Sequence, residues 1–247
     1  MADRTKHRAL VTGAAGTMGR AIVHEFVANG ISVAAVDIST GAMGDLVAES
    51  DGLVAAYGID ISDPRAVAAG AAGIVSEFRY IDILVNNAGI LSNNKTAETT
   101  PEEWNKVMAV NVSGAFYLTR ALLPQMRNHG WGRIINTSSY AAKSGGLTAG
   151  TAYSVSKAAM IGLTFSIAAE TTRDNITVNA IAPAYIRTPM VTMQLTPEQQ
   201  AEVEQKIPVG RYCEPEEFAN TVLFLAGEKT GFITGEVIDM NGGFHFD

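Results

Sequence analysis

The chain has 247 residues, 47% of them hydrophobic, and a formal net charge of −7. This length and composition fit one large α/β domain with a sizeable core, and an acidic chain without a basic run argues against a nucleic-acid partner. The single Cys213 excludes an internal disulfide and fits a reducing compartment, and the four histidines are too scattered to indicate a metal site.

The first residues are polar and lead directly into a predicted strand, so they do not have the pattern of a signal peptide. The apolar stretch 158–169 is short and is interrupted by Gly162, Thr164 and Ser166, which indicates a buried helix rather than a membrane span. We therefore expect a soluble, cytoplasmic protein with no membrane partner.

Apolar, β-branched runs alternate with longer helical stretches along the whole chain, which is typical of a parallel sheet with right-handed crossovers. The sequence predicts seven strands, at 9–11, 32–36, 53–57, 83–85, 134–136, 177–181 and 237–239. Helix starts are predicted by Asp63 before Pro64 and by capping-box patterns at 100–103 and 196–199. We therefore expect a single doubly wound, Rossmann-type domain over residues 1–247, with helices on both faces of the sheet.

Residues 187–212 interrupt the alternation between the sixth and seventh predicted strands. This stretch is mostly polar, contains Met190, Met193 and Leu195, and includes a short predicted helix. It is interpreted either as a solvent-covered excursion or as a flexible lid over a substrate. Because long loops at the carboxyl ends of strands often carry function, we favour the lid.

The first predicted strand runs into Gly13, Gly16 and Gly19, before a predicted helix at 20–29. Such glycines permit a tight turn, and the helix N-terminus offers unpaired amides to a pyrophosphate. This strand, turn and helix therefore predict a dinucleotide site.

Asp37, at the end of the second predicted strand, is placed to accept hydrogen bonds from the adenosine ribose hydroxyls. It would also repel a 2′-phosphate, and Ala14, Ala15, Ile38 and Ser39 bring no basic side chain to offset this. NAD(H) is therefore predicted over NADP(H). The alternative is that Asp37 only caps the turn at 39–40.

Further polar residues follow the third and fourth predicted strands at the same edge of the sheet. Asp60 is interpreted as an acceptor for the adenine amino group or as a helix-entry residue. The amides of residues 86–89 (Asn-Asn-Ala-Gly) either tie strands together or line the cofactor. The sequence leaves both pairs of alternatives open.

Tyr153 and Lys157 are four residues apart on a predicted helix, so their side chains share one face. An ammonium beside a phenol favours the phenolate, and we expect the Tyr153 pKa to fall toward a value useful for acid–base catalysis. The alternative is an aromatic ring packed under the lysine stem.

Asn111 begins a run of poor helix formers inside a well-capped helix, which indicates a functional break or a packing kink.

Taken together, these motifs closely resemble the short-chain dehydrogenase/reductase family in its small single-domain form, over nearly the whole chain. The resemblance rests on residues 12–19, Asp60, 86–89, Asn111, Ser139, Tyr153 with Lys157, and 183–188. It implies an NAD(H)-dependent oxidoreductase that interconverts a ketone and a secondary alcohol by hydride transfer.

The resemblance implies a role for each matching residue. Tyr153 is the general acid and base, Ser139 (rather than its neighbour Ser138) bonds the substrate oxygen, and Lys157 holds the nicotinamide ribose. Asn111 anchors a water that relays protons from Lys157. The implied cofactor contacts are Gly13, Gly16, Thr17, Met18, Gly19, Asp37, Ile38, Asp60, Ile61, Asn87, Ala88, Gly89, Tyr153, Lys157, Pro183, Ile186 and Thr188. The candidate substrate contacts, which suggest a compact apolar substrate, are Ile90, Ser139, Ala141, Tyr185, Met190 and Met193.

Three features depart from the family pattern. Thr17 replaces a usual glycine, Ala184 replaces the glycine after Pro183, and the interval from Ser139 to Tyr153 is one residue longer than is common. If the φ angle of Ala184 is positive, its backbone is strained. The longer interval changes the wall of the substrate pocket.

Within the family, the alternatives are a 3-oxoacyl thioester reductase and a sugar or polyol dehydrogenase. Asp37 counts against the thioester reductases, which commonly prefer NADP(H). A remote alternative is a non-catalytic NAD-binding regulator, and a sugar-nucleotide epimerase would need a larger C-terminal part. A homotetramer or dimer is also implied, through residues 235–246 and the small residues Ala158, Ala159, Gly162, Ala168 and Ala169, whose other interpretation is burial against the sheet.

Overall fold

The computed structural model describes residues 7–146, 148–189, 193 and 196–246. Seven parallel strands form one sheet in the order β3-β2-β1-β4-β5-β6-β7. The strands are β1 Arg8–Thr12, β2 Ser32–Asp37, β3 Val54–Gly58, β4 Ile83–Asn86, β5 Gly132–Thr137, β6 Ile176–Pro183 and β7 Val237–Met240. All seven predicted strands are confirmed, within two residues at either end, and so is the predicted doubly wound fold class.

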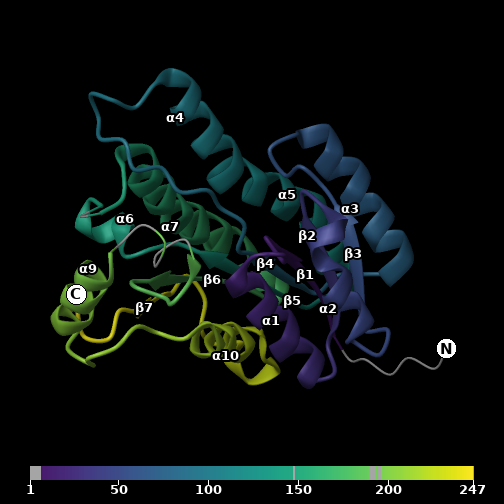
Figure 1. The fold of residues 1–247 in the computed structure, drawn as a ribbon. Coiled ribbons are helices and arrows are strands. Elements are labelled where there is room, and N and C mark those ends of the chain that lie inside the picture. The colour runs from purple at the N-terminus through teal and green to yellow at the C-terminus, as the bar shows by residue number, and fades with distance from the viewer. Residues whose placement is uncertain (1–6, 147, 190–192, 194–195, 247) are drawn as a thin grey trace.

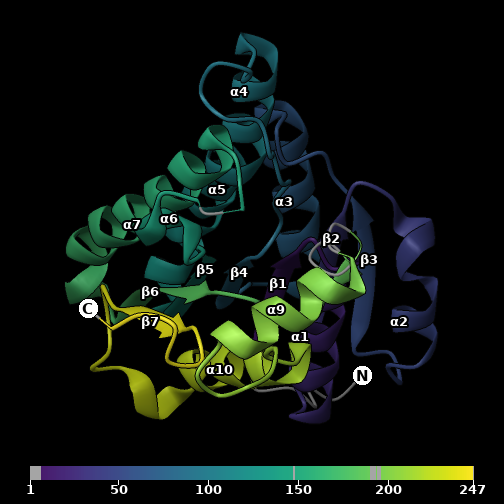
Figure 2. The same ribbon diagram turned by 60° about the vertical axis from the view of Figure 1, so that its left-hand side comes forward.

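Helices cover both faces of this sheet (Figures 1 and 2). α1 and α10 pack together on one face, and α3, α5 and α7 cover the other. The helices are α1 Thr17–Ala28, α2 Gly44–Ala48, α3 Pro64–Phe78, α4 Pro101–Met108, α5 Gly114–His129, α6 Ala141–Ser144, α7 Thr151–Thr171, α9 Pro197–Lys206 and α10 Pro215–Ala226. Short 3₁₀ turns span Thr40–Met43, Thr172–Asp174 and Glu228–Thr230.

The strand order reverses next to β1, whose neighbours are β2 and β4. The chain passes from the edge strand β3 across to β4, so the connections after β1 and β4 leave the sheet in opposite directions. In open α/β sheets ligands bind in the crevice at such a point, beyond the carboxyl ends of the strands. The fold therefore places a binding crevice beyond the ends of β1 and β4.

The predicted helix starts are mostly confirmed. The Asp63 carboxylate accepts from the amide of Arg65 at 2.8 Å, and the capping box at the start of α9 is complete. At α4 the predicted box is only half formed. The Thr100 hydroxyl accepts from the Glu103 amide, but the Glu103 carboxylate bonds Ser92 and Asn94 instead of returning to residue 100.

Helix α7 with its 3₁₀ extension spans Thr151–Asp174 and is long and apolar enough, by length and composition alone, to cross a membrane. The sequence argument that this segment is too short is therefore wrong. In the fold, α7 packs against β5 and β6, and its inner residues Met160, Thr164 and Ile167 are buried. A core helix meets the same criteria as a membrane span, and the packing identifies α7 as a core helix.

The predicted interruption at Asn111 is confirmed. α4 ends at Met108, a π-helical turn spans Ala109–Ser113, and α5 then continues to His129. π-helical turns inside helices are frequent at functional sites. Here the turn directs the buried Asn111 side chain toward the loop that follows β4.

His7 gives the start of β1 a pH-dependent contact. Its ring bonds the Asp82 carboxylate at 3.0 Å and the Glu228 carboxylate at 3.3 Å, and the bond to Asp82 raises the pKa of His7 above 6.5. A raised pKa stabilises the fold at low pH, and this contribution disappears as the pH rises through the pKa of His7 in the folded protein.

We expect His7→Gln to lower the free energy of unfolding by about 1 kcal/mol at about pH 6 and by less at about pH 9. Urea unfolding measures both values, and an equal loss at both pH values would contradict the assignment.

Candidate active site

The turn after β1 is shaped by two glycines that the backbone requires. Gly13 has a φ of +66°, and a Cβ added at Gly19 would lie 2.0 Å from the Gly13 carbonyl oxygen. Gly16, which precedes the first turn of α1, has room on the protein side, since an added Cβ would lie 3.4 Å from that same oxygen. Gly13 and Gly19 therefore set the path of the chain, whereas Gly16 leaves space for a ligand at the helix N-terminus.

A cavity of about 760 Å³ opens over this turn, beyond the ends of β1, β2 and β4. Its volume and its position at the helix N-terminus fit a dinucleotide. The predicted cofactor residues that line it are Gly13, Gly16, Thr17, Met18, Gly19, Asp37, Ile38, Asp60, Ile61, Asn87, Ala88, Gly89 and Thr188. Lining residues that the sequence did not single out for the cofactor are Ala15, Val36, Ile59, Ser62, Ile90, Lys106, Ala109, Val110 and Pro189.

Some of these missed residues carried a signal in the sequence. Ser62 follows Asp60 by two positions, and its amide and hydroxyl both bond the Asp60 carboxylate. Ala109 and Val110 belong to the same π-helical turn as Asn111. Lys106 carried no signal in the sequence, because its place at the cavity depends on how α4 is packed in the fold.

The Asp37 carboxylate lies in the cavity wall and is held by the backbone. Its oxygens accept from the amide of Ala15 at 3.0 Å and from the amide of Ile38 at 2.8 Å. These partners differ from the turn at 39–40, so the capping alternative is not supported. Arg20, which the sequence reading overlooked, lies close to this wall and donates to the Ala15 carbonyl, but its guanidinium pairs with Asp45 at 2.6 Å.

The open alternatives for the polar residues at this edge are now separated. Asn86 ties strands together, because its amide donates to the Asn136 side chain of β5 at 2.8 Å. Asn87 does both, since it donates to the Thr12 carbonyl at 3.0 Å and lines the cavity. Asp60 lines the cavity and also lies at the entry to α3, and its bonds to Ser62 lower its pKa.

Lys157 is buried, 4% exposed, at the carboxyl end of β5. Its ammonium donates to the Thr137 carbonyl at 2.8 Å, and burial lowers its pKa to about 8. It borders the dinucleotide cavity, because a Cβ added at Gly89 would lie 3.3 Å from its Nζ and 3.4 Å from the Oδ1 of Asn111. Lys157 and Asn111 thus meet behind Gly89.

The Asn111 side chain holds groups on two neighbouring segments. It accepts from the Ile90 amide at 2.8 Å and donates to the Ile90 carbonyl at 3.0 Å. It also donates to the Ser156 hydroxyl at 3.0 Å, on the helix that carries Tyr153. Asn111 therefore joins the π-helical turn, the loop after β4 and α7.

The Tyr153 phenol corrects one prediction. Burial raises its pKa, and a hydrogen bond with Ser139 opposes this only in part. The Lys157 ammonium lies 5.7 Å from the centre of the tyrosine ring and is bonded to a carbonyl oxygen. The expected fall in the Tyr153 pKa was wrong, because desolvation of the phenolate outweighs the hydrogen bond from Ser139.

The choice of Ser139 over Ser138 agrees with the geometry. The Ser138 hydroxyl is buried and donates to the Lys157 carbonyl at 2.8 Å, whereas Ser139 contacts the Tyr153 phenol. The condition for strain at Ala184 is not met, since its φ is not positive, and its amide donates to the Met240 carbonyl at 2.9 Å. Thr17 is accommodated as the first residue of α1.

Four predicted cofactor residues do not line the cavity itself. Lys157 lies behind Gly89, as described above, and its ammonium is 5.7 Å from the centre of the Tyr153 ring. Pro183 ends β6 opposite Met240, and Ile186 is buried and pairs with Cys213.

The candidate substrate residues lie in different surroundings. Ala141 is buried beside Ser139, Ile90 lines the dinucleotide cavity, and Met193 is 84% exposed. Tyr185 packs edge-on against Phe244, with ring centres 5.9 Å apart, and lines a second cavity of about 270 Å³. Met190 lies outside the described residues.

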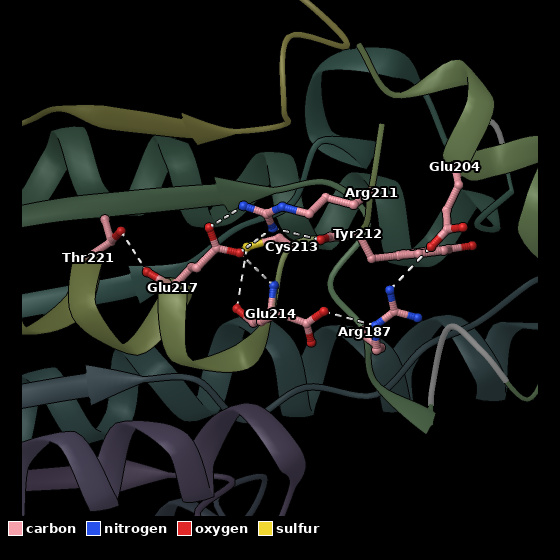
Figure 3. A network of polar contacts seen from close by, with 8 residues as sticks. All are labelled: Arg187, Glu204, Arg211, Tyr212, Cys213, Glu214, Glu217 and Thr221. Atoms are coloured by element: carbon pink, nitrogen blue, oxygen red, sulfur yellow. Dashed lines mark hydrogen bonds and ion pairs between the residues drawn. The ribbon is translucent and has the colours of Figure 1, made fainter. Parts of the chain in front are cut away.

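The predicted excursion at 187–212 contains α9, as expected, and ion pairs tie it to α10 (Figure 3). Arg187 bonds Glu204 of α9 at 3.2 Å and Glu214 at 3.0 Å. Farther along, Arg211 bonds Glu217 at 2.6 Å, and this contact lowers the pKa of Glu217 to about 2. The role of residues 187–212 as a lid remains a prediction.

Comparison with known proteins agrees with this geometry. Residues 13–245 match a family model described as enoyl-(acyl carrier protein) reductase. The chain is 40% identical to the acetoacetyl-CoA reductase of Rhizobium meliloti (strain 1021), over 96% of this chain and 98% of the relative. It is 38% identical to the 3-oxoacyl-[acyl-carrier-protein] reductase of Thermotoga maritima, over 95% of this chain and 96% of the relative.

A solved structure is also similar, that of a 3-ketoacyl-(acyl-carrier-protein) reductase from Brucella melitensis complexed with NADH. It has a TM-score of 0.91 and 29% identity, and covers 98% of this chain and 99% of that one. The fold and the site thus define an oxidoreductase of keto groups that uses a nicotinamide cofactor. The chain belongs to the short-chain dehydrogenase/reductase family.

The two roles of the glycines can be separated by mutation. We expect Gly16→Ala to fold normally and to bind NADH about tenfold more weakly, because its methyl group enters the ligand space. Gly19→Ala should instead lose about 1–3 kcal/mol of stability, because its methyl group overlaps the Gly13 carbonyl. NADH fluorescence titration and thermal unfolding of both variants make the comparison. Undiminished NADH binding by Gly16→Ala would contradict this placement of the pyrophosphate.

Proposed function

We propose that the protein is an NAD(H)-dependent carbonyl reductase and alcohol dehydrogenase in which Tyr153 is the general acid and base. The observation that carries the proposal is the contact of the Tyr153 phenol with Ser139, with the Lys157 ammonium 5.7 Å from the tyrosine ring centre and next to Gly89 in the wall of the dinucleotide cavity. Asn111, Ser139, Tyr153 and Lys157 are all present, which argues against a non-catalytic NAD-binding regulator.

In the direction of reduction, the raised pKa of Tyr153 keeps the phenol protonated at neutral pH. Tyr153 and Ser139 then both donate to the substrate oxygen, where negative charge develops. The bound nicotinamide supplies the hydride for the carbonyl carbon. Tyr153 gives its proton to the oxygen and, in the reverse direction, takes it back.

Lys157 and Asn111 support this transfer. The ammonium, with a pKa of about 8, is charged at neutral pH and lies at Gly89, where a ribose hydroxyl would reach it. When the tyrosine ionises, the cation stabilises the phenolate, as the sequence reading proposed. A water held by Asn111 as the proton relay from Lys157 stays part of the proposal.

Asp37 supports NAD(H) over NADP(H). Its carboxylate is fixed in the cavity wall by two amides, so it can accept from ribose hydroxyls and repels a 2′-phosphate. The cation near this wall, Arg20, is engaged by Asp45. The Brucella melitensis structure complexed with NADH is in keeping with this preference.

The substrate that we propose is a compact, mostly apolar ketone or secondary alcohol. Aromatic rings lie close to Ser139. The next residue, Tyr140, packs against Phe244, and the centres of these two rings are 5.5 Å apart. The names of the relatives favour a 3-oxoacyl thioester as the second candidate, whereas Asp37 favours a substrate outside that class. A sugar or polyol remains the third candidate.

We also propose a homotetramer or dimer. On the outer side of α7, Ala158, Gly162 and Ala169 are exposed and Phe165 is 50% exposed, so burial against the sheet does not explain these residues. Ala168, in contrast, is buried and packs near Gly235. A second copy would cover this apolar face.

A single domain and a cytoplasmic location are retained as predictions from the sequence.

Replacing Tyr153 tests the reaction directly. We expect Tyr153→Phe to lower kcat about 10²- to 10⁴-fold while NADH binding stays intact, because only the proton donor is removed. Turnover is followed by NADH absorbance over a panel of ketones and 3-oxoacyl thioesters. Tyr57→Phe, which loses only a hydroxyl bonded to Glu77, is the matched control. Retained turnover by Tyr153→Phe would remove the tyrosine from the mechanism.

Replacing Asp37 tests the cofactor preference. We expect Asp37→Ser to raise kcat/KM for NADPH relative to NADH about tenfold or more, because the repulsion of the 2′-phosphate is lost. Asp51→Asn, which removes an exposed carboxylate outside the cavity lining, should leave the ratio unchanged. An Asp37→Ser enzyme with the same NADPH to NADH ratio would refute the assignment.

A further inference from the structure

The loop between Ser139 and Tyr153 needs support from outside itself. After α6 it contains Gly145 and Gly146, with φ angles of +73° and +77°, and it reaches α7 through Gly150. Glycines lose more conformational freedom on folding than other residues, so such a loop does not keep one conformation by its own propensity. This is also the interval that is one residue longer than the family pattern.

Lys95 supplies that support from the segment after β4. Its ammonium donates to the Gly146 carbonyl at 2.7 Å and to the Ala149 carbonyl at 2.6 Å. Two carbonyl oxygens that face each other repel, and a cation with three donors satisfies both. Lys95 therefore clamps the loop at two points.

Backbone contacts continue the same junction to the start of α7. The amide of Gly150 donates to the Ser92 carbonyl at 2.7 Å, and the amide of Thr151 donates to the Asn94 carbonyl at 3.0 Å. A Cβ added at Gly150 would lie 2.4 Å from the Asn94 carbonyl oxygen, so the two backbones touch. Amides at a helix N-terminus lack partners within the helix, and here the 92–96 segment provides them.

The far side of this segment is anchored to α4. The Glu103 carboxylate accepts from the Asn94 side chain at 2.7 Å and from the Ser92 hydroxyl, and these bonds lower the pKa of Glu103. Glu103 therefore bonds Ser92 and Asn94 instead of completing its predicted capping box. It fixes the segment that carries Lys95.

The clamped loop lies directly against the catalytic helix. A Cβ added at Gly146 would lie 2.1 Å from the hydroxyl oxygen of Ser154, and that hydroxyl donates to the Gly150 carbonyl at 2.9 Å. Ser154 follows Tyr153 in the first turn of α7. A shift of the loop is therefore passed to the turn that orients the phenol toward Ser139.

We propose that Lys95 is a positioning residue for the reaction, which holds the loop at Gly146 and Ala149 so that Tyr153 stays aligned with Ser139. This inference rests on the function proposed for Tyr153. Nothing in it requires Lys95 to touch substrate or cofactor.

The test compares Lys95→Met, Lys95→Arg and, as a matched control, Lys229→Met, which removes an exposed lysine from the 3₁₀ turn Glu228–Thr230. Amide hydrogen exchange at residues 145–152 reports on the loop. Stopped-flow reduction of an active ketone from the panel above, with NADH and with 4-deuterated NADH, reports on the chemistry. For Lys95→Met we expect faster exchange at Gly150 and Thr151, kcat lowered about tenfold or more, a larger deuterium isotope effect and unchanged NADH binding. Lys95→Arg should restore most of kcat, since a guanidinium can also donate to two carbonyls.

Each other outcome overturns the inference. Unchanged exchange in Lys95→Met means that Lys95 does not hold the loop, and faster exchange with unchanged kcat means that the loop does not align the tyrosine. An equal fall in kcat for Lys229→Met means that the effect is one of charge alone. Tyr153→Phe, measured in parallel, separates the two levels, because an active Tyr153→Phe enzyme removes the proposed function itself.

Discussion

A buried ammonium joins helix α7 to the carboxyl end of strand β5, and the rest of the site depends on this joint. Lys157 donates to the Thr137 carbonyl at the end of β5, and the hydroxyl of the next residue, Ser138, donates back to the Lys157 carbonyl. A charge buried without partners is costly, so the lysine has few alternative positions. The joint places Tyr153, one turn earlier on the same helix, and brings the ammonium to Gly89 at the wall of the dinucleotide cavity. In the proposed mechanism, this one contact therefore sets both the binding of the cofactor and the orientation of the acid.

The surroundings of the two titratable groups push their pKa values in opposite directions. Burial raises the pKa of the phenol and lowers that of the lysine to about 8. Each shift favours the uncharged form, as expected for groups removed from water. In the proposed reaction, a phenol that stays protonated donates to a developing alkoxide, and Ser139 is the second donor. The protein then contributes position and hydrogen bonds, while hydride chemistry comes with the cofactor.

Much of this arrangement is readable from the chain because it follows from local rules. The inner strands are buried on both faces, so they appear as largely apolar runs, and the poor helix formers after Asn111 mark the π-helical turn. What the sequence does not contain is the outcome of tertiary packing. The direction of the Tyr153 pKa shift depends on how deeply the phenol is buried, and the partners of Glu103 depend on a loop folding back over α4. The contact of Lys95 with Gly146 joins segments 51 residues apart, and no periodicity signals it.

In the proposed mechanism, one carbonyl group fits between the reactive carbon of the bound nicotinamide and the Tyr153 phenol. A crystal structure of the protein with NAD and a secondary alcohol that it oxidises tests this most directly. We expect nicotinamide C4 within about 3.5 Å of the carbinol carbon, with the alcohol oxygen bonded to both Tyr153 and Ser139. A dinucleotide bound with its nicotinamide away from α7, or an alcohol oxygen that contacts neither hydroxyl, would contradict it.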